Sequence, residues 1–247
     1  MTDFRAWVAT LPAMDGRIRV TTGPVAEIVF DHPASKNALD PRMMVALADA
    51  VDTVSTARAI ILRGEGSAFC SGGNLKQVRD HLATPGAGDV FRAFMKDAVD
   101  RLLALDAVVI AAVNGFALGG GAELAASCDI VHAGTLARIG FVHAKLGVSP
   151  GFGGGQRLVR RVGPHRALRL LADPEPVTAA EALSLGLVEA VTNDPVASAR
   201  ALANRIASLP PDAAAAAKRI AFGGEKEEAA AFAALWGGPA HRAALDR

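Results

Sequence analysis

Short apolar runs alternate with longer segments of helical periodicity along the first 190 residues of the chain. The apolar runs over 59–63 and 107–113 predict buried β-strands. Two further strands are predicted over 17–22 and 26–30, on either side of the Gly23-Pro24 turn, and a short one over 130–131. The segments between and after them predict helices over about 41–54, 89–105, 156–161 and 164–172. A chain that repeats strand and helix in this way is typical of an α/β core.

Two helix starts carry explicit capping signals. Asp40 is followed by Pro41, which predicts an N-cap with proline at the first helical position. Thr178 stands three residues before Glu181, which predicts a capping box at the start of a short helix. The helix over 89–105 is predicted to turn one face to the core, marked by Val90, Phe94, Ala98, Arg101 and Leu105.

The two ends of the chain differ from the middle. Residues 1–16 predict only an irregular or short helical lead-in. From residue 195 the chain reads almost entirely as helix, so we predict a core over 1–190 and a C-terminal helical region over 191–247. A helical segment is interrupted over 84–88, where TPGAG predicts a mobile loop of the kind that often lies over a binding site.

Composition narrows the class of protein. Hydrophobic residues make up 51% and charged residues 21% of the chain, and the net charge is +1 without a basic block. We therefore expect neither nucleic acid nor a membrane as partner. The only cysteines, Cys70 and Cys128, do not have metal-ligand spacing, so we predict no metal site. No apolar stretch approaches the ~18 residues of a membrane span, and we predict a soluble, cytoplasmic protein with no signal peptide.

The segment over 114–129, NGFALGGGAELAASCD, joins a predicted strand to a predicted helix. A helix N-terminus has free N–H groups that attract negative charge, and glycine lets a ligand approach the backbone. Glu123 follows in the first turn and could act as an acid or base beside those donors. The alternative is a tight turn packed against a neighbour, with Glu123 on the surface. Both interpretations stay open from this segment alone.

Five segments in order resemble the crotonase (enoyl-CoA hydratase/isomerase) superfamily. Three carry the glycine motifs, SAFCSGGNLK at 67–76, NGFALGGGAELAASCDI at 114–130 and GFVHAKLGVSPGFGGGQRL at 140–158. The other two are DHPASKNALD at 31–40 and EALSLGLVEAV at 181–191. The resemblance covers nearly the whole chain from residue 17.

This resemblance implies an architecture and a substrate class. The family has a crotonase (ClpP-like) fold, a spiral of ββα turns with a C-terminal helical region that serves in oligomerisation and covers the active site. It also implies a homotrimer or a dimer of trimers. The substrate is an acyl-CoA, so that coenzyme A is part of the substrate and no separate cofactor is expected.

The resemblance also implies site residues. Two backbone N–H groups polarise the thioester carbonyl and stabilise an enolate, and they fall on Gly73 and Gly120. The first of two catalytic glutamates falls on Glu123. Coenzyme A binding is implied for Lys36, Ala38, Ser71, Gly73, Asn74, Leu75 and Lys76. For Lys36 and Lys76, solvated surface lysines are the alternative.

At the position of the second glutamate this chain has His143. A hydration that uses two carboxylates on one water therefore lacks its second carboxylate. The segment FVHAKLGVSPGFGG at 141–154 most resembles the ethylmalonyl-CoA/methylmalonyl-CoA decarboxylase branch, as do LATPGAGD at 82–89 and LWGGPA at 235–240. Loss of CO2 itself generates the enolate, and histidine can bind a carboxylate or donate a proton near neutral pH.

Other functions are weighed against decarboxylation. The nearest alternative is an enoyl-CoA hydratase or isomerase with altered catalytic groups, followed by cleavage of a β-diketone or a thioester and by acyl-CoA binding without chemistry. The glycine order does not match a dinucleotide-binding fingerprint, and that class is rejected. His143 could also be a core histidine bonded to a backbone carbonyl, which is the role expected of His32, His81, His132, His165 and His241.

Overall fold

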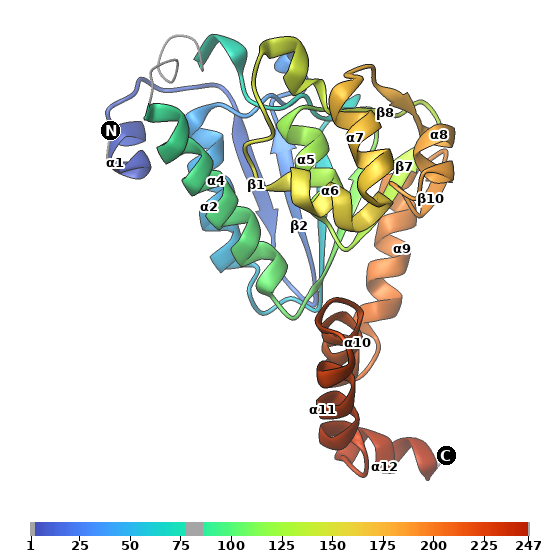
Figure 1. Ribbon diagram of the computed structural model, residues 1–247. Helices are drawn as coiled ribbons and strands as arrows, with labels where there is room; N and C mark the ends of the chain where they lie inside the picture. Colours follow the sequence, from blue (N-terminus) through green and yellow to red (C-terminus); the bar gives the residue numbers. More distant parts are fainter. Residues whose placement is uncertain (1–2, 78–85, 247) are drawn as a thin grey trace.

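The computed structural model describes residues 3–77 and 86–246 of the chain. Its main sheet has the strand order β1-β2-β3-β5-β7-β10. Figure 1 shows β1 and β2 toward one side of this sheet and β7 and β10 toward the other. The strands are β1 (Arg17–Thr21), β2 (Val25–Asp31), β3 (Ala59–Gly64), β5 (Val108–Val113), β7 (Ile130–Gly134) and β10 (Ala190–Thr192). β1 pairs antiparallel with β2, and the other neighbours are parallel. The five predicted strands are confirmed. β3 and β5 are apolar runs because both faces of a central parallel strand are buried, whereas β1 is an antiparallel edge strand whose residues are exposed or half-buried in alternation.

A second, four-stranded sheet has the order β4-β6-β8-β9. Its strands are β4 (Ala68–Cys70), β6 (Phe116–Leu118), β8 (Arg138–Gly140) and β9 (Val177–Thr178). β4, β6 and β8 each follow a strand of the main sheet directly in sequence, and a helix comes after each pair. The chain therefore repeats ββα units, which confirms the α/β spiral fold. Strands of two or three residues are too short to be recognised by periodicity.

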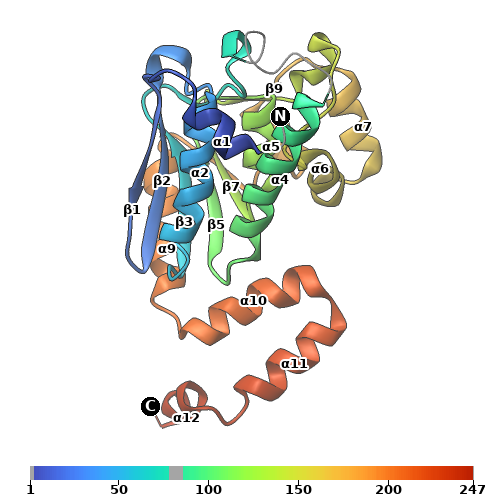
Figure 2. The ribbon, with the colours of Figure 1, turned by 90° about the vertical axis from the view of Figure 1, so that its left-hand side faces the viewer.

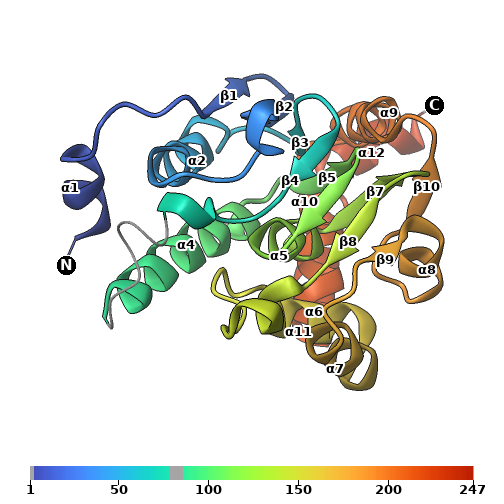
Figure 3. The same cartoon turned by 90° about the horizontal axis from the view of Figure 1, so that it is seen from above.

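Helices cover both faces of the main sheet. On one face lie α1 (Phe4–Ala9), α2 (Pro41–Thr53), α4 (Ala87–Ala104) and α5 (Gly120–Ser127), and on the other lies α9 (Pro195–Ala207), as Figure 3 shows from above. Ala199 and Ala203 of α9 pack with Ile61 and Ile110. The large core cluster, which includes Ile60, fills the opposite face. Alternation along β3 thus sends neighbouring side chains into two separate cores.

The predicted helix starts are confirmed where a cap was recognised. Asp40 Oδ1 accepts a hydrogen bond of 2.9 Å from Met43 N, and Pro41 is the first residue of α2. Thr178 and Glu181 form a reciprocal capping box at the start of α8 (Ala179–Ser184). The remaining segments are η1 (Pro33–Ser35), η2 (Val142–Leu146), α6 (Gly154–Val162) and α7 (Pro164–Ala172).

The predicted core face of α4 was only partly right. The residues it buries are Ala87, Met95, Ala98, Val99 and Leu102. Arg101 lies outside this face and pairs with Asp52. Val90, Phe94 and Leu105 are half-buried and pack against the same core, so Arg101 is the position of the predicted face that departs from it. The predicted loop over 84–88 was also too long, because α4 begins at Ala87 with Gly86 as N-cap; Thr84 and Pro85 lie outside the described residues.

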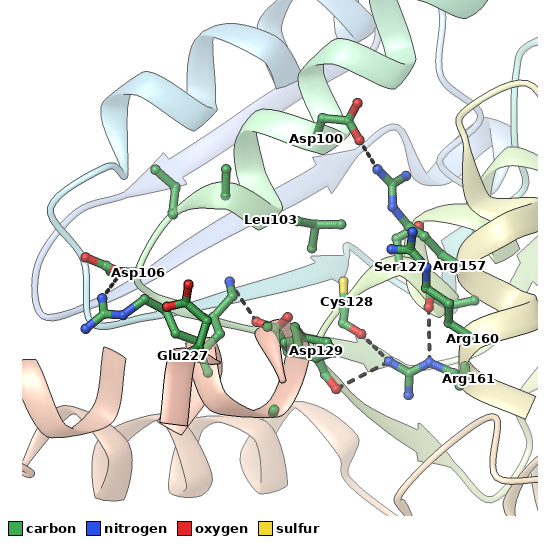
Figure 4. A pocket seen from close by; sticks show the side chains of 18 of the residues that line it. Asp100, Leu103, Asp106, Ser127, Cys128, Asp129, Arg157, Arg160, Arg161 and Glu227 are labelled. Atoms are coloured by element: carbon green, nitrogen blue, oxygen red, sulfur yellow. Dashed lines mark hydrogen bonds and ion pairs between the residues drawn. The ribbon is translucent and has the colours of Figure 1, made fainter. Parts of the chain in front are cut away.

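Three further helices project from the core, α10 (Pro211–Gly223), α11 (Glu225–Leu235) and α12 (Pro239–Leu245) (Figure 2). Lys218 of α10 pairs with Asp129 at 3.0 Å, and Arg219 pairs with Asp106 at 2.7 Å. Between these helices and the core lies a cleft of about 1070 Å³, with Asp129 and Arg161 in its wall (Figure 4). The domain boundary at 190/191 stays a prediction. Over 3–77 and 86–246, no helix is long and apolar enough to cross a membrane.

Candidate active site

The turn between β6 and α5 depends on two glycines. Gly119 caps the helix at φ 52°, ψ −123°, a conformation that favours glycine, and its N–H donates to Gly140 O at 2.9 Å. A Cβ on Gly121 would lie 2.0 Å from the carbonyl oxygen of Cys70. The close approach brings β4 against the first turn of α5, where the N–H of Gly120 has no intrahelical acceptor.

Gly73 lies in the loop that follows β4. Leu39 N donates to Gly72 O at 2.7 Å, and Asn74 N donates to Leu39 O at 2.9 Å. Gly73 lies between the two residues that make these bonds. In a parallel bridge such a residue points its own N–H away from the partner strand, so the N–H of Gly73 points away from Leu39. A Cβ on Gly72 would lie 3.2 Å from Gly120 N. The structure therefore brings the loop of Gly73 against the start of α5.

Glu123 is buried, with 1% of its surface exposed, and is not a surface residue at a helix start. Its Oε1 accepts a hydrogen bond of 3.0 Å from Gly151 N. Its Oε2 accepts hydrogen bonds of 2.9 Å from both Phe152 N and Gly154 N. Three backbone donors from the loop before α6 thus hold the carboxylate, in the manner of an anion at a helix N-terminus.

His143 lies on η2 and is 9% exposed. Its Nε2 lies 3.0 Å from Oε1 of Glu123. Its Nδ1 is buried and has no hydrogen-bond partner among residues 3–77 and 86–246. The partner of the ring is thus a carboxylate, not the backbone carbonyl of the alternative interpretation. The structure places His143 and Glu123, 20 residues apart, in direct contact.

Phe152 is a site residue that the sequence reasoning missed. Its ring lies over the start of α5, since a Cβ on Gly120 would be 2.5 Å from Phe152 Cε2. Phe91 of α4 packs edge-on against Phe152, with ring centroids 5.6 Å apart. The only sequence signal is an aromatic residue within a glycine-rich segment, GFGGG. The two rings give the site an apolar wall beside Gly120.

The residues expected to bind coenzyme A fall on two loops that are bonded together. Ser71 N donates to Lys36 O at 3.0 Å, and Ser71 Oγ donates to Ser35 O at 3.1 Å. Lys36 has a left-handed backbone and its Nζ lies 4.7 Å from the centre of the Phe116 ring. Ala38 and Asn74 flank the Leu39–Gly73 bridge. The structure brings these residues together at one edge of the second sheet.

Leu75 and Lys76 are exposed immediately after this bridge. Asn74 Oδ1 accepts hydrogen bonds from the N–H groups of Lys76 and Gln77, at 3.2 and 3.3 Å. Asn37, which the sequence reasoning did not single out, is fully buried, and its Nδ2 donates to Glu65 O and Ala68 O at 2.9 and 2.8 Å. Asn37 therefore fixes the first loop against β4.

Of the other groups expected to be structural, Cys70, Cys128 and His132 are buried, whereas His165 is exposed and His241 is half-buried, so the expectation of a core histidine was wrong at these last two positions. Burial raises the pKa of both thiols, Cys70 and Cys128, to about 12. Burial lowers the pKa of His132, whose Nδ1 lies 3.0 Å from Ser198 Oγ. His81 lies outside the described residues. Within the described part of the chain, no three His, Cys, Asp or Glu residues are grouped to hold a metal ion.

Comparisons with known proteins show which family the chain is similar to. The family model for enoyl-CoA hydratase/isomerase matches residues 21–231. The ethylmalonyl-CoA decarboxylase of Danio rerio is 36% identical over 234 residues, covering 88% of this chain and 77% of the relative. The short-chain-enoyl-CoA hydratase of Clostridium acetobutylicum is 37% identical over 203 residues, covering 80% and 77%. The structure of enoyl-CoA hydratase from Thermoplasma volcanium has a TM-score of 0.85 at 30% identity, covering 95% of this chain and 97% of that chain.

Proposed function

Because the chain belongs to the enoyl-CoA hydratase/isomerase (crotonase) family, we propose that it decarboxylates a short 2-alkylmalonyl-CoA such as ethylmalonyl-CoA or methylmalonyl-CoA. The observation that carries the proposal is the contact of 3.0 Å between His143 Nε2 and Glu123 Oε1. Hydratases of the family have a second carboxylate at the position of His143. This chain has an imidazole there, and it contacts the first carboxylate, Glu123. Relatives named ethylmalonyl-CoA decarboxylase, at 31–36% identity, support the same reaction.

The reaction needs three contributions from the protein. The N–H groups of Gly73 and Gly120 hold the thioester oxygen, and the electron pair of the breaking Cα–CO2 bond flows into the enolate on that oxygen. The apolar wall of Phe91 and Phe152 favours loss of the charged carboxylate as neutral CO2. His143 then gives a proton to Cα, which restores the thioester carbonyl.

Coenzyme A is the other half of the proposed substrate. Its nucleotide and pantetheine arm would lie along the loops of Lys36, Ala38 and Ser71 and the segment from Gly73 to Lys76. Lys36 and Lys76 supply positive charge for phosphate groups, while the loop backbone supplies donors and acceptors. No further cofactor enters the proposal, because loss of CO2 supplies the electron pair.

Enoyl-CoA hydration or isomerisation is the second candidate function. The 37% identity to a short-chain-enoyl-CoA hydratase favours it, as does the presence of Glu123. Against it stands the missing second carboxylate at His143, because such a hydration uses two carboxylates to position and activate one water.

The test is incubation of the purified protein with ethylmalonyl-CoA, methylmalonyl-CoA and crotonyl-CoA, followed by mass spectrometry of the thioesters. Decarboxylation predicts loss of CO2 from one or both malonyl thioesters and no gain of water by crotonyl-CoA. Loss of CO2 from neither substrate would reject the proposal, and hydration of crotonyl-CoA would support the second candidate. His143→Ala should lower the decarboxylation rate by roughly 10²–10⁴-fold, the usual contribution of a general acid.

Assembly and location belong to the proposal as well. We infer a homotrimer or a dimer of trimers, built through the C-terminal helices, in the cytoplasm. Large apolar side chains that this chain leaves exposed on those helices support the assembly, among them Phe222, Phe232 and Trp236. Burial of such side chains between subunits would supply the driving force.

A further inference from the structure

All hydrogen-bonding positions of the Glu123 carboxylate are occupied. Oε1 accepts from Gly151 N and contacts His143 Nε2, and Oε2 accepts from Phe152 N and Gly154 N. A carboxylate has about four lone-pair positions, two on each oxygen. Glu123 therefore has no position left with which to bind a substrate or activate a water.

The surroundings also prevent Glu123 from turning away. The three N–H donors belong to one short segment, 151–154, and rotation of the carboxylate would break at least two of their bonds. Arg157 of α6 donates to Phe152 O at 3.1 Å and holds that segment in place. The side-chain stem is confined as well, because Gly154 packs directly on it.

The contact with Glu123 determines which nitrogen of His143 carries the hydrogen. The carboxylate accepts three backbone N–H bonds, an arrangement that favours its acceptor-only form, so the hydrogen shared with His143 belongs to Nε2. In the neutral ring the hydrogen is then on Nε2 and the lone pair is on Nδ1. Nδ1 is also the ring nitrogen that is buried without a partner among the described residues.

We propose that Glu123 is a positioning residue that fixes the Nε2–H form of His143, and that Nδ1 of His143 is the atom that delivers the proton to Cα. The inference rests on the proposed function for its chemical step. In that step the Nδ1–H bond of the imidazolium breaks, the enolate electron pair forms the new Cα–H bond, and the ring becomes neutral with Nε2–H still bonded to Glu123. After the product leaves, water that enters the emptied site returns a proton to Nδ1.

The assignment differs from one in which Glu123 exchanges a proton with the substrate. In that case Glu123 and His143 would contribute separately to the rate. If Glu123 acts only through His143, its removal matters only while the imidazole is present.

The first test needs no substrate. Two-bond proton–nitrogen correlation spectra of protein with ¹⁵N-labelled histidine, recorded above neutral pH, report which ring nitrogen carries hydrogen. We expect His143 in the Nε2–H form in the unaltered protein and a shift toward the Nδ1–H form in Glu123→Gln. His132, which bonds Ser198, serves as internal control and should not change. An Nδ1–H form of His143 in the unaltered protein would overturn the proposal, whatever the variant does.

The second test is a double-mutant cycle on CO2 release and on protonation at Cα in D2O, with Glu123→Gln, His143→Gln and the double variant. We expect each single variant to lose about 10²–10⁴-fold in rate and stereospecific deuteration, and the double variant to be no slower than His143→Gln. Rate losses that multiply in the double variant would contradict the positioning role. If the unaltered protein releases no CO2, the proposed function fails, while the tautomer measurement still decides the role of Glu123.

Discussion

Gly154 packs directly on the side chain of Glu123. A Cβ built on Gly154 would lie 2.4 Å from Cβ and 2.7 Å from Cγ of Glu123, closer than real side-chain atoms come. The missing side chain lets Gly154 N approach Oε2 to 2.9 Å. The first residue of α6 is therefore a glycine because the helix begins against a buried carboxylate.

Gly154→Ala should destabilise the protein and displace Glu123. Adding a methyl group to such a contact typically costs about 1–3 kcal/mol in free energy of unfolding. Thermal unfolding and the decarboxylation rate should both fall. Gly155→Ala is the matched control, because its Cβ would lie 3.6 Å from Pro150, an ordinary contact, and alanine favours a helix over glycine by about 0.5–1 kcal/mol. Equal effects of the two substitutions would contradict the packing argument.

Gly120→Val should abolish activity while the protein still folds. The N–H group of Gly120 cannot be removed by substitution. A side chain at Gly120 would instead overlap the ring of Phe152. The ring would have to move, and the thioester oxygen of the proposed substrate would lose its place beside the N–H. Loss of one such donor costs about 3 kcal/mol of transition-state stabilisation, more than roughly 100-fold in rate. Gly134→Ala in β7 is the control, because its Cβ meets nothing closer than 3.6 Å. Full activity in Gly120→Val would remove Gly120 from the oxyanion site.

The parts of the fold that sequence could predict are those with a local signal. The run over 107–113 predicts β5 because both faces of that strand are buried, and Asp40 predicts the start of α2 because its own side chain makes the cap. The short strands of the second sheet carry no such signal. Their partners come from distant parts of the chain, β4 with β6 and β6 with β8, so the pairing is not visible in any local segment.

The candidate site likewise has parts that the sequence could predict and parts that it could not. Sequence resemblance identified Glu123 and His143, but not the bond between them or the hold of residues 151–154 on the carboxylate. Those contacts join residues 20 to 31 positions apart. Phe152 was missed because its role depends on where the ring lies, over Gly120, and not on its spacing from any other residue.

Cys70 and Cys128 should not react with thiol reagents in the folded protein. Both thiols are buried, and burial raises the pKa of each to about 12, so the reactive thiolate is scarce at neutral pH. Titration with an aromatic disulfide reagent should release colour from neither thiol in buffer and from both in denaturant. Fast labelling of either residue without denaturant would contradict its burial.

Asp40→Asn should stabilise the protein at neutral pH. Burial raises the pKa of Asp40 above its ordinary 3.8, so the folded state disfavours the charged form. The contribution of Asp40 to stability is therefore greatest below pH 3.8 and is lost as the pH rises through the raised pKa. Asparagine keeps the oxygen that caps α2, and its amide would replace Oδ2, which has no partner among the described residues.

The amide introduced by Asp40→Asn would lie near the side chain of His32. Oδ2 of Asp40 and the unpartnered Nδ1 of His32 lie 2.7 and 2.9 Å from the same point, the position of a Cβ on Gly16. Urea unfolding from about pH 3 to pH 7 should show a gain for Asp40→Asn that grows as the pH rises above 3.8. Asp40→Ala, which loses the cap, should instead destabilise by about 1 kcal/mol.

Assembly of the protein should depend on the apolar side chains of α10–α12. Phe222 is 69% exposed and Trp236 is 66% exposed, and Trp236 stacks on Phe232 at 5.1 Å without covering either ring. If these side chains lie between subunits, Phe222→Ser with Trp236→Ser should shift the protein toward monomer in analytical ultracentrifugation. Leu136→Ser is the control, because Leu136 is 84% exposed but belongs to the turn between β7 and β8 and not to these helices. A monomer in the unaltered protein, or an unchanged oligomer in the double variant, would exclude this surface as the subunit interface.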